Sequence, residues 1–182
     1  MADFNACVDH VLANEGGYSD NLKDKGGATN FGISLRFLKE VNPKTLARIG
    51  ITGEVNKQVI KELTKEKAIS LYYSEFWNTA RFDKIMNGII AKYVFDMAVN
   101  HGLHQATLNV QRACCSAQKK LDFIMCDGLL GPKTLGAINQ ISFSLIPPMI
   151  SERAGFMRRI VARKPDQKVF LDGWLTRCFD IG

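Results

Sequence analysis

One polar, glycine-rich segment near the start of the chain, residues 14–33, limits what the chain can fold into more than any other feature. Just before it, apolar residues recur at the spacing of one helix face: Phe4, Val8, Val11 and Leu12. This periodicity predicts a helix, and the Gly16-Gly17 pair predicts a turn that ends it. Glu15 would then lie at the last turn of the helix, with irregular polar backbone after it.

The carboxyl groups of this segment are expected to lie in two different environments. The C-terminal end of a helix is the negative end of its dipole, which disfavours a charged carboxylate at Glu15, as would an apolar wall beside it. Asp20 and Asp24 lie among glycines and polar residues, where water keeps a carboxylate ionised. A carboxyl group held protonated near neutral pH suits a general acid, and an ionised carboxylate near it completes the glycosidase pattern.

Two other interpretations remain open on residue types alone. A loop rich in Asp, Asn and Gly after a helix is commonly a solvated surface loop with no further role. A calcium site is the second alternative, although Asp20 and Asp24 do not follow the alternating positions of an EF-hand loop. The pattern therefore indicates chemistry without deciding it.

The order of residues in this segment resembles a family signature. Residues 15–20 read E-G-G-Y-x-D and residues 24–33 read D-x-G-G-A-T-N-F-G-I, which is similar to the glycoside hydrolase family 108 muramidases. That family includes phage endolysin-type lysozymes and bacterial muramidases that serve protein release. Similar segments extend over nearly the whole chain: Y-Y-x-x-F-W at 72–77, F-D at 95–96, V-N-H-G at 99–102, Gln111, D-G-x-x-G-P-x-T at 127–134 and F-x-x-G-W-x-x-R at 170–177.

The resemblance implies a reaction and a set of site residues. The reaction is hydrolysis of the β-1,4 bond between N-acetylmuramic acid and N-acetylglucosamine in peptidoglycan, with no metal and no other cofactor. Glu15 would be the general acid, and the spacing of Glu15, Asp24 and Thr29 is similar to the Glu, Asp and Thr trio of the phage lysozymes. Lys25 stands where the family commonly has proline, which removes no chemical group. The other motif residues expected to contact substrate are Tyr18, Asp20 and Asn30.

The spacing within the motif favours inversion of configuration. A loop containing glycine separates Glu15 from Asp24, and Thr29 follows shortly after it. A nucleophilic carboxylate must lie about 5 Å from the acid, whereas a base that activates water needs about 6.5–9.5 Å, which leaves room for a hydroxyl to orient that water. A loop carboxylate with a threonine nearby fits the second geometry better.

Three residues outside the motif are also expected to contact substrate. A helix is predicted after Thr64, with Tyr72 and Phe76 expected in the core. Trp77 lies at the end of this helix, where an indole would border a groove and stack on a sugar ring. Asn100 and His101 precede the helix stop at Gly102, in a position suited to an N-acetyl group or a carbonyl. His101 and His104 form only an H-x-x-H pair, which is too little for a metal site.

The periodicity of the rest of the chain predicts a mainly α fold with at most a short β-hairpin in the glycine-rich region. Residues 42–56, which are punctuated by proline and glycine, are expected to be irregular. We expect a lysozyme-like helical domain at residues 1–103 and a small helical module at residues 104–182. The turn at 127–132 resembles the hallmark turn of peptidoglycan-binding modules. Asp96, on the predicted central helix, needs a buried partner, and a hydrogen bond from loop backbone is favoured over a catalytic role.

The formal charge of +6 lies mostly in the C-terminal part of the chain. Residues 105–182 contain 11 basic and 6 acidic side chains, against 13 and 12 in residues 1–104. We expect Arg158 and Arg159, on a helix with Arg153 and Arg163, to bind the wall. The alternative function is a non-catalytic basic protein that binds wall or nucleic acid. Nucleic acid is disfavoured because only Phe156 is interleaved with the basic residues of 149–164.

Length and composition bound the remaining possibilities. A chain of 182 residues with 46% hydrophobic residues can bury one substantial core. No apolar run is long enough to span a membrane, and the first residues lack the features of a signal peptide. Five cysteines without C-x-x-C spacing argue against a disulfide framework and a zinc site. We expect a monomer made in the cytoplasm that reaches peptidoglycan in the periplasm by another route, without stable membrane insertion.

Overall fold

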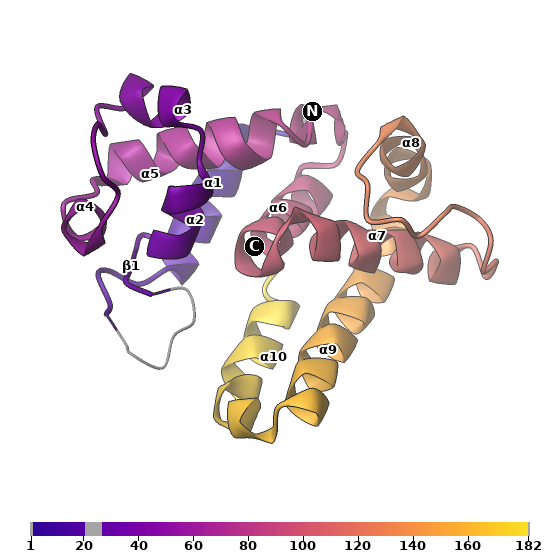
Figure 1. Ribbon diagram of the computed structural model, residues 1–182. Coiled ribbons are helices and arrows are strands. Elements are labelled where there is room, and N and C mark those ends of the chain that lie inside the picture. Colours follow the sequence, from indigo (N-terminus) through magenta and orange to yellow (C-terminus); the bar gives the residue numbers. More distant parts are fainter. Residues whose placement is uncertain (1, 21–26, 182) are drawn as a thin grey trace. The chain divides into compact units, whose positions relative to one another are not determined.

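The structure is a computed structural model that describes residues 2–20 and 27–181. The fold is mainly α-helical, and the described residues contain one two-stranded antiparallel sheet, as the sequence predicts. The chain divides into two compact units, Phe4–Thr79 and residues 80–181 together with residues 2 and 3. Figure 1 labels the elements of both units.

The Phe4–Thr79 unit consists of short helices and a small hairpin. Its elements in chain order are α1 (Phe4–Asn14), β1 (Thr29–Asn30), β2 (Ile33–Ser34), α2 (Leu35–Glu40), α3 (Pro43–Arg48), α4 (Lys57–Lys61) and α5 (Lys65–Leu71). Helix α5 continues directly into a π-helical segment, Tyr72–Asn78. Helix α3 corrects the sequence interpretation, which predicts irregular backbone over 42–56. Asn42 caps this helix and Pro43 occupies its first position, where the missing N–H of proline costs nothing.

Side-chain caps begin the short helices of this unit. The Ser34 hydroxyl accepts a hydrogen bond from the backbone N–H of Phe37 at 3.1 Å, which starts α2. The Thr64 hydroxyl accepts from the backbone N–H of Lys67 at 3.4 Å, so a helix begins after Thr64 as the sequence predicts. Each cap satisfies a backbone donor that the first turn of a helix leaves without an intrahelical partner.

The unit of residues 80–181 contains the longer helices. They are α6 (Gly88–His101), α7 (Leu103–Ala117), α8 (Pro132–Ile141), α9 (Ile146–Arg163) and α10 (Leu171–Phe179), with 3₁₀ helices at Phe82–Lys84, Ser142–Leu145 and Pro165–Phe170. Gly102, with a φ of 83°, ends α6 and turns the chain directly into α7. Among the residues that the structure describes, no helix has the length and apolar character to cross a membrane.

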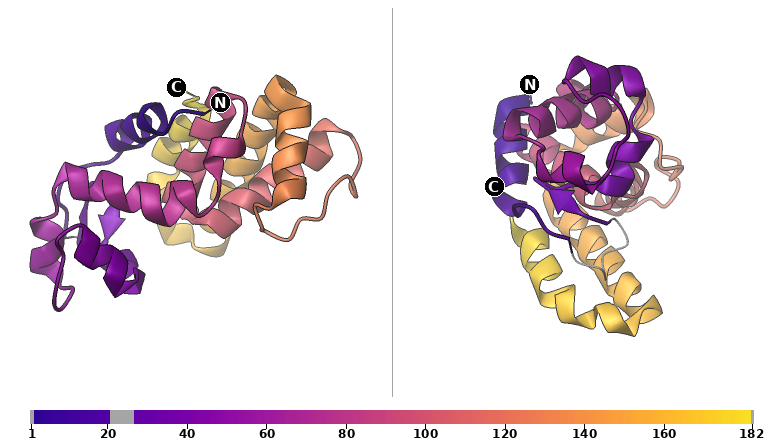
Figure 2. Two further views of the ribbon diagram at one scale, coloured as in Figure 1. Left: turned by 90° about the horizontal axis from the view of Figure 1, so that it is seen from above. Right: turned by 60° about the vertical axis from the view of Figure 1, so that its left-hand side comes forward.

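Helix α6 forms much of the interior of this second unit, because most of its residues from Ile90 to Ala98 are buried. Helices α9 and α10 lie side by side and run in opposite directions, as Figure 2 also shows. Buried Ala154, Met157 and Cys178 join these two helices in a small apolar cluster. The long helices are therefore held by packing along their apolar faces.

Candidate active site

Glu15 follows the last residue of α1, as the sequence predicts. Its backbone N–H donates to the carbonyl of Leu12 at 3.3 Å, which closes the last turn of the helix. The side chain is half-buried. Gly16 and Gly17 come next, and a Cβ built on either would meet no atom of the described residues within 4 Å.

The hairpin of β1 and β2 pairs Thr29 with Ser34 and Asn30 with Ile33. Its two turn residues, Phe31 and Gly32, have φ values of 49° and 75°. Positive φ at both central positions is the geometry of a type I′ turn, whose twist matches that of the paired strands. Phe31 adopts a conformation that costs an L-residue roughly 1–2 kcal/mol, so the surroundings must hold it there.

Asn30 anchors the hairpin to the end of α4. Its amide nitrogen donates to the carbonyls of Ile60 at 3.0 Å and Leu63 at 3.3 Å, and the residue is 6% exposed. The structure thus gives the Asn30 amide nitrogen an internal role, and contact with substrate stays a prediction.

Gly32 brings the carboxyl group of Glu15 and the hydroxyl of Tyr72 to one place. A Cβ on Gly32 would overlap the Tyr72 hydroxyl and lie 2.8 Å from Cγ and 2.9 Å from Cδ of Glu15. The same hydroxyl donates to the carbonyl of Phe31 at 2.8 Å, which ties it to the strained turn. Glu15 is therefore packed against the hairpin turn, and the π-helical segment supplies Tyr72 to the same place.

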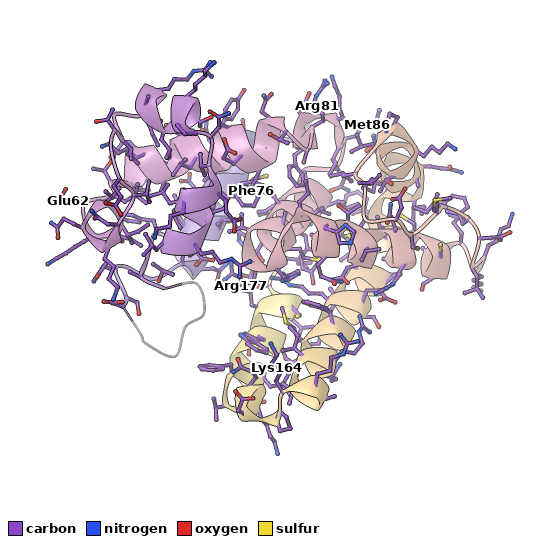
Figure 3. The ribbon with its side chains drawn as sticks, in the orientation of Figure 1. Glu62, Phe76, Arg81, Met86, Lys164 and Arg177 are labelled. Atoms are coloured by element: carbon purple, nitrogen blue, oxygen red, sulfur yellow. The ribbon has the colours of Figure 1, made fainter. Side chains whose placement is uncertain are left out.

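Tyr72 lies beside Glu15, and the sequence interpretation misses this because it assigns Tyr72 to the core together with Phe76. The side chain is fully buried, so the assignment to the core is correct for the ring. A buried tyrosine needs a partner for its hydroxyl, and that requirement is the signal that could have indicated a polar neighbour. Figure 3 labels Phe76, whose ring centroid lies 5.9 Å from that of Tyr72.

The chain after Gly17 runs beside β1. Ser19 and Thr29 exchange backbone hydrogen bonds of 2.9 Å and 2.8 Å, so Thr29 is held between Ser19 and its partner Ser34. Tyr18 is 42% exposed. Asp20 pairs with the Lys57 ammonium at 3.0 Å, which joins this stretch to α4. Asp24 lies outside the described residues, and its role stays a prediction.

The sequence predicts that Trp77 borders a groove, but the structure buries this residue. The indole is 4% exposed and packs edge-on against Phe4, with ring centroids 5.4 Å apart. The helix does not end before Trp77, because the π-helical segment continues to Asn78 and turns the side chain into the interior. A buried indole has no face left for a sugar ring, so the prediction for Trp77 is wrong.

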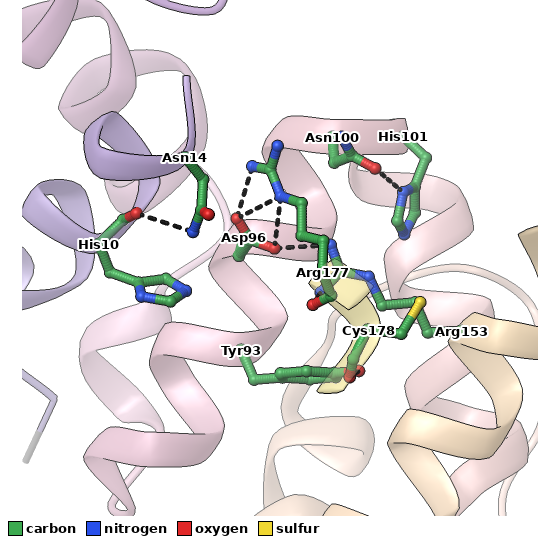
Figure 4. Close-up of polar contacts among 9 residues, drawn as sticks. All are labelled: His10, Asn14, Tyr93, Asp96, Asn100, His101, Arg153, Arg177 and Cys178. Atoms are coloured by element: carbon green, nitrogen blue, oxygen red, sulfur yellow. Dashed lines mark hydrogen bonds and ion pairs between the residues drawn. The ribbon is translucent and has the colours of Figure 1, made fainter. Parts of the chain in front are cut away.

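Asn100 and His101, which are also predicted to contact substrate, belong to the unit of residues 80–181, and Figure 4 shows them in close-up. Asn100 is exposed, and its side-chain oxygen lies 2.9 Å from Nδ1 of His101. The His101 ring lies 5.1 Å from Phe156, and its buried Nε2 has no hydrogen-bond partner among residues 2–20 and 27–181. Burial, together with the charge of Arg153, lowers the pKa of His101 to about 3, so the imidazole is neutral at neutral pH.

Asp96 has two arginine partners in place of the loop backbone that the sequence interpretation favours. Its carboxylate accepts from Nη2 of Arg153 at 2.6 Å and from Nη2 of Arg177 at 2.7 Å. Burial alone would raise the pKa of Asp96, but the hydrogen bonds from Arg177 and the charge of Arg153 outweigh it and hold the pKa below its usual range. This cluster joins α6, α9 and α10 (Figure 4).

The same cluster corrects the expectation for Arg153. This side chain is fully buried, and its guanidinium lies 5.1 Å from the centre of the Tyr93 ring. Arg153 therefore cannot reach an external wall. Arg158 and Arg159, on the same helix, are both exposed and keep their predicted role as a proposal.

The D-G-x-x-G-P-x-T motif folds as a turn organised by Gln111. The Gln111 amide nitrogen donates to Asp127 at 2.8 Å and to the Thr134 hydroxyl at 3.0 Å, and its oxygen accepts from the backbone N–H of Gly128 at 2.9 Å. The hydrogen bond from Gln111 lowers the pKa of Asp127. Next to this turn, a groove of about 530 Å³ lies between residues 122–125 and the first turns of α8.

Comparison with known proteins adds to this geometry. Residues 8–102 match the family model of glycosyl hydrolase 108, and residues 105–179 match a model described as a predicted peptidoglycan domain. Among solved structures, the chain is similar to that of Brucella abortus SagA, with a TM-score of 0.76 and 28% sequence identity over 98% of this chain and 90% of that chain. No curated protein matches the chain.

These matches, with the helical fold, define the class of the protein as a glycoside hydrolase that acts on peptidoglycan. Within that class, the chain belongs to glycosyl hydrolase family 108, as the sequence motifs indicate. The two matched regions meet between residues 102 and 105, whereas the compact units divide between residues 79 and 80. Helix α6 thus belongs to the region that matches the hydrolase family model, but it packs with the C-terminal helices.

Proposed function

We propose that this protein hydrolyses the β-1,4 bond between N-acetylmuramic acid and N-acetylglucosamine, with Glu15 as the general acid. The observation that supports this assignment is the packing of the Glu15 carboxyl against the Gly32 turn beside the Tyr72 hydroxyl. A general acid must be held in one geometry relative to the glycosidic oxygen, and a carboxyl group wedged against backbone has little freedom to move. Tyr72 is a positioning residue in this proposal.

The remaining steps need a water molecule and a second group. Glu15 would give its proton to the glycosidic oxygen as the bond to the sugar breaks. Water would then attack the sugar carbon from the opposite face. Asp24 is the proposed base on sequence grounds, and the Thr29 hydroxyl would orient the water. Tyr18 is exposed on the stretch that leads away from Glu15, which suits stacking against a sugar ring.

A turbidity assay on isolated cell walls tests the role of Glu15. Glu15→Gln keeps the shape of the side chain but removes the transferable proton, so activity should fall roughly a thousandfold with the thermal transition unchanged. Asp20→Asn is the matched control, because it neutralises a nearby carboxylate whose partner is Lys57, and it should lose much less. Retention of about a tenth of wild-type activity by Glu15→Gln would exclude the general acid and favour the non-catalytic binding alternative.

The proposed stereochemistry is inversion. With Asp24 activating water, the first sugar released from a β-linked substrate would have the α configuration at its new reducing end. NMR spectra recorded during the first turnovers can distinguish the two anomers before mutarotation mixes them. An initial β anomer, or a glycosyl-enzyme adduct on Asp24, would show a retaining reaction instead.

The C-terminal region is proposed to hold the enzyme on its substrate. Its match to a predicted peptidoglycan domain supports this role. Arg158 and Arg159 are exposed on α9 and would attract acidic groups of the wall. The protein is proposed to act as a monomer on the wall in the periplasm.

A further inference from the structure

We propose that the turn between α9 and α10 is a peripheral docking surface for an anionic lipid bilayer. This hairpin tip comprises Arg163, Lys164, Lys168, Val169 and Phe170, from the last residue of α9 to the end of the 3₁₀ helix Pro165–Phe170. Helices α9 and α10 lie side by side in Figures 1 and 2, and Figure 3 labels Lys164 in the turn that joins them. The hairpin tip shares no residue with the candidate active site.

The apolar residues of the hairpin tip are exposed although a core lies directly beside them. Val169 is 80% exposed and Phe170 is 51% exposed. No residue of the 3₁₀ helix Pro165–Phe170 is buried. The interior of the helix pair is formed instead by Ala154, Met157 and Cys178. The free energy of the system falls when hydrocarbon replaces the water around two adjacent apolar side chains at the end of a hairpin.

An aromatic pair supports the apolar end of the hairpin. The Phe170 ring stacks on Trp174 with centroids 5.9 Å apart and ring planes 24° apart. Trp174 is half-buried and packs against the cluster between α9 and α10. An indole that is apolar on one side and wet on the other is the aromatic group that prefers the headgroup level of a membrane. Trp174 thus lies where it would meet that level if Phe170 entered the bilayer.

Basic side chains surround these apolar residues. Residues 163–170 contain three basic side chains and a single acidic one, Asp166, which gives a net charge of +2. Arg163, Lys164 and Lys168 are all exposed. In the part of the chain that the structure describes, none of the three forms an ion pair, so their charge is available to a partner. Anionic headgroups complement this charge and attract basic segments over roughly a Debye length.

The combination of charge and apolar exposure favours a bilayer over the wall. Peptidoglycan is a hydrated polymer of sugars and peptides, so it offers charge but no hydrocarbon in which Val169 and Phe170 could be buried. A bilayer with anionic lipids offers both, and a short apolar tip with a basic rim binds at the interface without spanning it. Two apolar side chains are few, so the binding should be reversible and should depend on the charge of the lipid.

Cosedimentation of the full chain with vesicles tests this surface. Vesicles of equal parts phosphatidylglycerol and phosphatidylcholine should bind the protein at least roughly tenfold more strongly than phosphatidylcholine alone, and high salt should remove the difference. The double substitution Val169→Asp with Phe170→Asp should lower partitioning by roughly tenfold. The matched control is Met86→Asp with Phe143→Asp, which are 70% and 64% exposed in the same unit and should change partitioning by less than about threefold.

Several outcomes would overturn the proposal. Equal binding of the wild type to both kinds of vesicle would remove the role of charge, and equal losses in the two double variants would remove the role of the hairpin tip. The variant with Val169→Asp and Phe170→Asp could also bind vesicles as the wild type does but sediment less with insoluble peptidoglycan. That result would make the hairpin tip a contact for the wall.

Fluorescence quenching gives a readout that needs no substitution at the hairpin tip. Brominated anionic lipids should quench the emission of Trp174, because this residue would lie at the headgroup level. The second tryptophan, Trp77, is 4% exposed and should stay protected from the bilayer. Emission that brominated vesicles leave unquenched, under conditions where the protein sediments with them, would place Trp174 away from the membrane and contradict the docking geometry.

Discussion

The two compact units begin most of their helices in different ways. In Phe4–Thr79, helices α2 to α5 span five to seven residues, and a Ser, Asn or Thr side chain caps each of them. In residues 80–181, the Asn87 side chain caps α6, but helices α7 to α10, of nine to eighteen residues, have no side-chain hydrogen bond at the N-cap among the described residues. A short helix closes few internal hydrogen bonds and depends on its cap, whereas a long one is held by packing of its apolar face.

The polar groups of the two units differ in the same sense. Asp96 and Arg153 are buried and joined to each other, so their charges hold helices together. Glu15 is half-buried at a helix end, on a stretch that continues to the exposed Tyr18. Helix caps stabilise the smaller unit locally, so the side chains of its loops remain available for catalysis. The larger unit uses its polar side chains for stability.

The largest expected effect on stability follows from removing the charge of Asp96. Asp96→Asn removes the ion-pair partner of the fully buried Arg153 and one ion-pair partner of Arg177. Breaking a buried ion pair from one side costs about 3–5 kcal/mol of the free energy of unfolding. Urea denaturation monitored by circular dichroism would measure this loss.

The control for Asp96 is a carboxylate of the same unit whose ion pairs are exposed. Asp83 pairs with Arg81 at 3.4 Å and with Lys84 at 3.3 Å, and the three side chains are 44%, 58% and 54% exposed. Asp83→Asn should cost less than about 1 kcal/mol, since water screens such pairs. Similar costs for the two substitutions would contradict the view that buried charges stabilise this unit.

Helix ends and the partners of Asp96 show what sequence can and cannot predict about the fold. Local signals such as Thr64, Gly102 and Pro132 lie next to the helix ends that they set, so these helix ends could be predicted. Arg153 and Arg177 are separated from Asp96 by 57 and 81 residues. The need of Asp96 for a partner follows from its place on a buried helix, but the identity of that partner depends on tertiary packing.

The next effect concerns the packing of Glu15 in the smaller unit. Gly32→Ala would place a methyl group on the Tyr72 hydroxyl and within 3 Å of the Glu15 side chain. Displacing a catalytic group by a fraction of an ångström reduces turnover, so we expect a loss of roughly ten- to a hundredfold in kcat, equivalent to about 1.4–2.7 kcal/mol. Steady-state hydrolysis of a soluble muropeptide would measure it.

Gly27→Ala separates this loss from backbone strain. Gly27 has the same φ of 75°, but a Cβ there would make only ordinary contacts, 3.5 Å and 3.8 Å, with the Leu35 side chain. Both substitutions place alanine in the left-handed region and should destabilise the fold by about 1 kcal/mol. If kcat fell equally in both, the packing of Gly32 against Glu15 would have no special role.

The candidate site was only partly predictable for the same reason as the fold. The place of Glu15 follows from the helix pattern and the Gly16-Gly17 pair, which are adjacent in sequence. Tyr72 reaches the site from a segment more than fifty residues away, and its sequence context indicates only burial. Trp77 was misplaced because a π-helical segment, which has no clear sequence signal, carries it inward.

The smallest effects concern the caps themselves. The Asn56 side chain accepts hydrogen bonds from the backbone N–H groups of Gln58 at 2.9 Å and Val59 at 3.3 Å, at the start of the five-residue helix α4. Asn56→Ala should cost about 1 kcal/mol in thermal or urea unfolding. A much smaller cost would mean that α4 is held by packing, as the longer helices are.

Adding a cap in the other unit reverses this test. Helix α8 begins after Gly131, whose φ of −91° suits any residue and around which a Cβ would meet no atom within 4 Å. Gly131→Ser supplies a hydroxyl that can accept from the first turn of α8 and reduces the freedom of the unfolded chain, so it should stabilise by about 0.5 kcal/mol. Gly131→Ala also reduces the freedom of the unfolded chain but supplies no hydroxyl. The difference in unfolding free energy between the two variants therefore isolates the contribution of the cap. Because α8 spans ten residues and buries Ala137, Ile138 and Ile141, this difference should be smaller than the loss at Asn56. An equal or larger gain in unfolding free energy would show that the stability of the long helices depends on their caps as much as that of the short ones does.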